Sequence, residues 1–111
     1  MLEKDKKEIV MHFEDPNYKK LKIWNKIKSI SWTPKEWDVV SWSLDRLAEL
    51  AQSKEYLEDN PDFLTNEGLQ WEEFWDDMER LLDMTYEESE SEYRSKLAVV
   101  RSIMRKLNYQ G

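Results

Sequence analysis

The chain has 111 residues and a formal net charge of -7, and it contains no cysteine, one histidine, two glycines and three prolines. A chain of this length can bury a core without disulfides or a structural metal, and the lack of cysteine excludes a disulfide framework, a thiolate zinc site and a cysteine nucleophile. So few glycines and prolines disfavour sheets with many tight turns and favour long helices joined by few loops.

The first thirty residues contain two apolar patterns. Residues 2–14 place several apolar side chains on one helical face, although the run 9–13 also fits a short strand. Asp15 then offers an N-cap, and Pro16 suits the first position of a helix. We therefore expect a second helix that continues to about residue 30.

A capping box marks the start of the next helix. Thr33 and Glu36 have the spacing of such a box, and Pro34 occupies the first helical position. Apolar residues then recur at the three-four spacing of a bundle helix: Trp37, Val40, Leu44, Leu47 and Ala51. Asn60 and Pro61 are expected to end this helix, because proline disrupts helical hydrogen bonding.

The last part of the chain predicts a hairpin of two helices. Residues 63–64 are expected to plug one end of the core, and Gly68 to close the loop that follows. The pattern is helical from Trp71 to about residue 84, and residues 85–88 have the form of another capping box. An apolar stripe defines the final helix: Tyr93, Leu97, Val100, Met104 and Leu107.

These patterns together predict an all-α fold and a single helical domain over residues 1–111. The expected arrangement is an antiparallel bundle of about four main helices plus an N-terminal segment that is helical or a short strand. No apolar run approaches the roughly 18 residues that a bilayer requires. We therefore expect a cytoplasmic protein that does not engage a membrane.

Six tryptophans are many for this length, and four fall on apolar stripes where they are expected to anchor the core: Trp24, Trp37, Trp71 and Trp75. Trp42 lies about 140° from Trp37 around its helix, on the same side as Val39 and Leu50. One interpretation is a central helix that also packs on the N-terminal segments. The other is an exposed apolar patch of Val39, Trp42 and Leu50 that binds a partner or a second copy.

The helix that begins at Trp71 also carries an acidic face, with carboxylates at i, i+4, i+7 and i+11 and two flanking residues: Glu72, Glu73, Asp76, Asp77, Glu79 and Asp83. Like charges at this spacing weaken an isolated helix, so a cationic group is expected opposite them. An arginine stripe on the last helix is one candidate: Arg94, Arg101 and Arg105. Because residues 54–90 carry fourteen acids and two bases, a surplus negative surface should remain.

Few catalytic mechanisms are open to this composition. His12 is the single histidine and is expected at the surface, and no phosphate-binding glycine loop is present. We therefore expect a protein that is not an enzyme and that uses no metal and no cofactor.

The leading hypothesis is a small acidic module that neutralises or recruits a basic partner protein, in the manner of an immunity protein, an antitoxin or a phage-encoded inhibitor. One alternative is a structural subunit or homodimer that uses the apolar face around Trp42. A third is nucleic-acid binding through the basic ends of the chain, which the negative net charge disfavours.

Overall fold

The computed structural model describes residues 16–108. The predicted segment 2–14, including His12, lies outside the described residues. Every regular element within 16–108 is a helix, which confirms the all-α class. The elements in chain order are α2 (Pro16–Lys19), α3 (Trp24–Lys28), α4 (Pro34–Ala51), α5 (Lys54–Asp59), α6 (Glu67–Glu88) and α7 (Glu90–Lys106).

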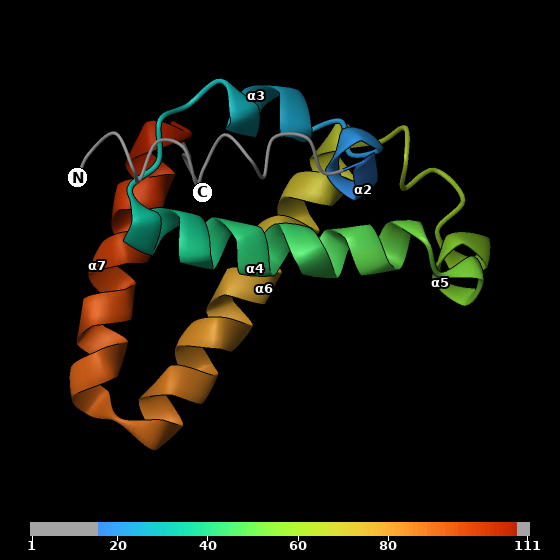
Figure 1. The fold of residues 1–111 in the computed structure, drawn as a ribbon. Helices are drawn as coiled ribbons and strands as arrows, with labels where there is room; N and C mark the ends of the chain where they lie inside the picture. The colour runs from blue at the N-terminus through green and yellow to red at the C-terminus, as the bar shows by residue number, and fades with distance from the viewer. Residues whose placement is uncertain (1–15, 109–111) are drawn as a thin grey trace.

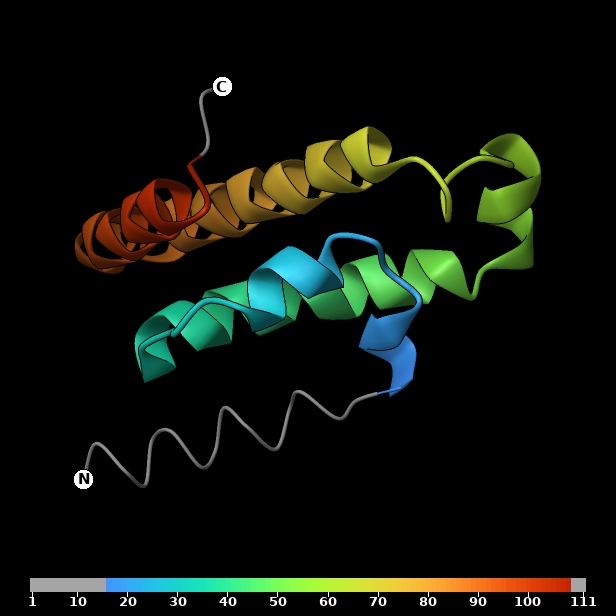
Figure 2. The ribbon, with the colours of Figure 1, turned by 90° about the horizontal axis from the view of Figure 1, so that it is seen from above.

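Three long helices form the framework. Figure 1 shows α6 and α7 as the two arms of a V, joined at its closed end, with α4 crossing both arms. From above, α6 and α7 form one layer, and α4 forms a second layer with α2 and α3 (Figure 2). The predicted hairpin of the last two helices is thus present, and α4 braces it.

The predicted start of α4 is confirmed. The Thr33 hydroxyl accepts a hydrogen bond from the Glu36 N–H, and the Glu36 carboxylate accepts one from the Thr33 N–H, which completes the capping box. All members of the predicted apolar stripe of α4 are buried. Since α4 contacts α2, α5, α6 and α7, it is the central helix that one of the two interpretations required.

The expected helix over residues 16–30 is wrong, because the chain turns between α2 and α3. Gln70 of α6 explains the break. Its fully buried side-chain oxygen accepts hydrogen bonds from the N–H groups of Lys22 and Ile23, at 2.8 and 3.3 Å. Its amide nitrogen donates to the carbonyl of Phe63 at 2.8 Å. This Gln70 cluster satisfies backbone groups that a continuous helix would have paired internally.

Three expected boundaries also differ from the structure. The helix begun at Pro34 ends at Ala51, and Ser53 caps the separate helix α5 before Asn60 is reached. Gly68 lies inside the first turn of α6, which Asn66 caps. The capping box predicted at Thr85 is absent, because the Thr85 hydroxyl donates to the carbonyl of Leu81 within α6 at 2.7 Å. Phe63 is fully buried, as the predicted plug requires.

We predict that Gln70→Leu lowers the free energy of unfolding by roughly 3 kcal/mol, because each buried polar group left without a partner costs about 1–3 kcal/mol. Urea denaturation followed by circular dichroism measures this loss. Asn25→Leu, an amide-to-leucine change at an exposed position of α3, is the matched control and should alter stability by less than about 0.5 kcal/mol. A loss below 1 kcal/mol for Gln70→Leu would contradict the assigned role.

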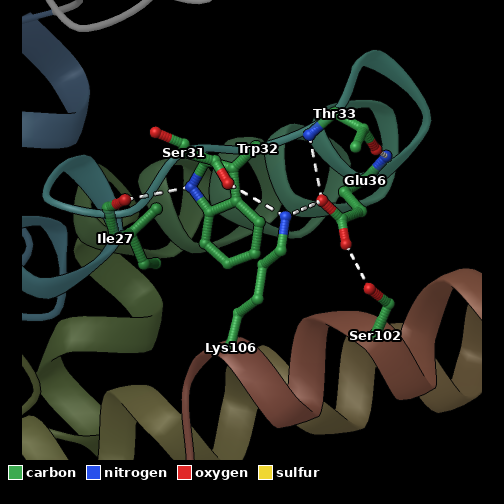
Figure 3. A network of polar contacts seen from close by, with 7 residues as sticks. All are labelled: Ile27, Ser31, Trp32, Thr33, Glu36, Ser102 and Lys106. Atoms are coloured by element: carbon green, nitrogen blue, oxygen red, sulfur yellow. Dashed lines mark hydrogen bonds and ion pairs between the residues drawn. The ribbon is translucent and has the colours of Figure 1, made fainter.

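A second polar cluster, the Glu36 network, fastens the carboxyl end of α7 to the start of α4 (Figure 3). The buried Glu36 carboxylate accepts hydrogen bonds from Ser102 and Lys106 of α7. Lys106 Nζ also donates to the carbonyl of Ser31 at 2.9 Å and lies 5.6 Å from the centre of the Trp32 ring. The Trp32 indole N–H donates in turn to the carbonyl of Ile27 at 3.0 Å. The network therefore joins α3, α4 and α7.

The Glu36 network makes the free energy of unfolding depend on pH. Burial alone would raise the pKa of Glu36, but hydrogen bonds from Lys106, Ser102 and Thr33 outweigh it and hold the pKa below the ordinary value of 4.5. A carboxyl whose pKa is lowered by folding stabilises the protein above its unfolded pKa. This contribution is lost as the pH falls through the lower, folded-state value.

We predict that Glu36→Gln lowers the free energy of unfolding by about 1.5–3 kcal/mol at pH 7, the range for hydrogen bonds to a charged group. The gap between the variant and the wild type should narrow as the pH falls from the ordinary carboxyl pKa of 4.5 through the lower folded-state pKa of Glu36, because the wild-type carboxyl is then protonated in both states. Urea titrations between pH 7 and pH 3 measure both effects. Glu87→Gln, at an exposed position of α6, serves as the control, and a gap independent of pH would refute the assignment.

Candidate functional site

A groove lies between residues of the first half of α6 and the last residues of α7. These two segments form the open end of the V (Figure 1). The volume of the groove is about 640 Å³, and α3 contributes Lys26 to its rim. Four carboxylates line it: Glu67, Glu72, Asp76 and Glu79. We call this feature the acidic groove.

Two tryptophans line the acidic groove. Trp71 and Trp75 are partly buried against the core, with ring centres 6.2 Å apart and planes 18° from parallel, and both pack edge-on against the buried Phe74. The sequence pattern predicted both as core anchors; they pack on the edge of the core, whereas Trp24 and Trp37 are buried within it as expected. The groove thus combines aromatic surface with a rim of acids.

The orientation of α6 explains this difference. Its buried residues form one stripe that includes three polar side chains: Gln70, Phe74, Asp77, Met78 and Thr85. At about 100° per residue, this stripe is rotated by about 50° from the one that the tryptophans suggested. Because of this rotation, Trp71 and Trp75 lie at the edge of the inward face. The polar residues at core positions make that face hard to recognise from the sequence. The spacing of Gln70, Phe74 and Asp77 is the signal that could have revealed it.

Because α6 is rotated in this way, the six residues of the predicted acidic face differ in their exposure. Glu72, Asp76 and Glu79 are exposed and line the acidic groove, and Asp83 continues the same exposed stripe towards the closed end of the V. Glu73 is half-buried. The expectation that Asp77 points outward is wrong, because it faces α4 and retains only 3% of its accessible surface.

Asp77 lies in a small charged cluster between α4 and α6. Its Oδ1 atom is 3.7 Å from Arg46 Nε and 3.7 Å from Arg80 Nη1, and its buried Oδ2 atom has no hydrogen-bond partner among residues 16–108. Burial raises the pKa of Asp77, and the two arginines only partly oppose this effect. Burial also raises the pKa of Glu73, and the neighbouring Asp77 adds to the rise.

The predicted apolar patch is not gathered at the surface. Val39 is buried, and Leu50 is half-buried against the core. Trp42 is half-exposed, but the Arg46 guanidinium lies 5.2 Å from the centre of its ring. Because Arg46 also approaches Asp77, Trp42 belongs to the polar cluster between α4 and α6 and not to a separate apolar surface.

The arginine stripe of α7 does not neutralise the acids of α6. Arg94 pairs with Glu90 of its own helix at 3.0 Å, and Arg101 and Arg105 are exposed. Across residues 16–108, no ion pair joins α7 to the acidic residues of α6. The arginine stripe of α7 is therefore not paired with the acidic residues of α6 within residues 16–108.

The acidic groove is suited to cations that also present a flat or apolar surface, because indole faces attract cations and carboxylates pair with them. No group of three or more histidine, aspartate or glutamate side chains within 16–108 is arranged to hold a metal ion. Nor does any helix in that range have the length and apolar character needed to cross a bilayer. The chain matches no family model, no curated protein and no solved structure.

The negative electrostatic field of the acidic groove should be detectable by ionic quenching of tryptophan fluorescence. We predict that caesium ions quench Trp71 and Trp75 more strongly than iodide does when each ion's quenching constant is divided by its constant for free N-acetyltryptophanamide, because the carboxylates concentrate cations and exclude anions. Trp71→Phe/Trp75→Phe should remove most of the caesium-sensitive emission. Trp42→Phe is the control and should leave that emission in place, because Arg46 lies against the Trp42 ring. Equal relative quenching constants of the two ions for the wild type would mean that the groove has no negative electrostatic field.

Proposed function

We propose that this protein is a non-catalytic binding module whose acidic groove docks a basic partner protein. One observation carries the proposal: Glu72, Asp76, Glu79 and Asp83 form an exposed stripe without an ion pair to any residue within 16–108. Like charges at helical spacing weaken a helix, and a basic partner would relieve that repulsion.

The chemistry of the groove supports a protein partner. Charged stripes accelerate diffusional encounter, and half-exposed tryptophans supply the kind of aromatic contact that dominates binding energy at protein interfaces. Both features occur in the same groove, on one face of α6. An inhibitor or neutralising protein for a basic target would use them together.

Reversing charge in the groove tests the proposal. We predict that Glu72→Lys/Asp76→Lys keeps its helix content but fails to retain a basic protein that the wild type captures stoichiometrically from its source organism. The association rate with that protein should fall by at least about tenfold at low salt, and the salt dependence should flatten. Capture followed by mass spectrometry and stopped-flow kinetics give the two readouts.

Glu87→Lys/Glu88→Lys is the matched control, with the same charge change at exposed positions of the last turn of α6, away from the groove. This control should bind at close to the wild-type rate. Equal rates for the two double variants would contradict the proposal, as would capture of nucleic acid alone or of further copies of this chain.

A further inference from the structure

Gly68 is a glycine that the fold does not require. It lies in the first turn of α6, and its backbone does not adopt a positive φ. A Cβ atom placed there would be 3.4 Å from Asn66 Oδ1, an ordinary contact. Glycine weakens a helix relative to alanine, so at this position the local fold would favour alanine. Gly68 does, however, line the acidic groove.

The missing side chain leaves space next to Trp71. Positions three apart lie on the same side of a helix, so Gly68 precedes Trp71 by one turn on the face that lines the groove. Trp75 lies one turn further along and stacks on Trp71. Glu67 directly precedes Gly68 and Glu72 follows it by about one helical turn, and both exposed carboxylates line the groove.

We propose that this part of the acidic groove binds an arginine side chain of the basic partner, with the guanidinium stacked on the Trp71 indole above Gly68 and its N–H groups donated to Glu67 and Glu72. The proposal rests on the proposed function and names the group that the groove recognises. Charge complementarity favours a cationic occupant, because the residues within 16–108 that line the groove include four acids and one base, Lys26.

Arginine fits the arrangement better than lysine. A guanidinium is planar, stacks on aromatic rings and presents N–H groups along its edges, so it can contact an indole and two carboxylates together. An ammonium is a compact, strongly hydrated charge that gains less from the ring. The groove volume of about 640 Å³ admits a side chain together with part of the segment that carries it.

Two peptides of equal charge test the assignment on the full-length protein. One carries three arginines separated by glycine and serine, and the other carries lysines at the same positions. Tryptophan indole N–H signals in nuclear magnetic resonance report both affinity and location. We expect the arginine peptide to bind at least threefold more tightly and to shift the Trp71 signal most, consistent with a modest cation–π gain at a partly exposed site.

Variants separate the elements of the site. Gly68→Leu fills the space and should weaken arginine-peptide binding at least fivefold, while Gly68→Ala should weaken it less and keep the protein folded. Trp71→Leu should abolish the preference for arginine over lysine. Lys26→Glu should tighten binding of both peptides. Trp42→Leu, at a half-exposed tryptophan outside the groove, is the matched control and should change neither affinity.

The outcomes distinguish this inference from the proposed function. Equal binding of the two peptides, with loss only in Glu72→Lys/Asp76→Lys, would overturn the arginine site and leave a basic-partner surface intact. No binding of either peptide at low salt would overturn the arginine site, and the capture experiment then decides the proposed function separately. Self-association of the wild type in sedimentation, removed by Gly68→Leu, would identify a second copy as the occupant and also overturn the inference.

Discussion

The hydrogen bonds of Gln70 fix which side of α6 faces the core. Its buried amide bonds to backbone groups of two other segments, so the helix cannot rotate without leaving those groups unpaired. With Gln70 inward, Trp71 lies about 100° away at the edge of the core, and the next residues of the acidic stripe lie outside. The hydrogen bonds of one polar side chain therefore account for both the division of α2 from α3 and the aromatic surface of the groove.

Local signals explain how much of the fold can be predicted from the sequence. The start of α4 is encoded by Thr33, Pro34 and Glu36, which are neighbours in the chain, and its apolar stripe has no competing pattern. The all-helical class follows from the same kind of evidence. The break between α2 and α3 depends on Gln70, 47 residues further along the chain from Ile23, so no local pattern contains it.

The candidate site was predicted in part for the same reason. The exposed stripe of Glu72, Asp76, Glu79 and Asp83 follows from helical spacing alone, which tertiary contacts leave unchanged. The sequence predicts Asp77 on the exposed acidic face and leaves Val39 open between a central helix and a surface patch, because neither pattern contains the neighbouring helices that bury both side chains. Trp71 was assigned to the core because apolar character normally indicates burial, whereas Gln70 takes the inward position beside it.

Ser89 is the last capping residue of α6 and the first of α7, so the two arms of the V meet at one residue. The groove lies at the other end of those arms, about 25 Å away at 1.5 Å per residue. A rotation of about 4° at this corner would therefore move the groove walls by about 2 Å, following the lever length of the helices. The width of the groove therefore depends on the angle between α6 and α7 at this distant corner, and α4, which contacts both helices, together with the Glu36 network braces that angle.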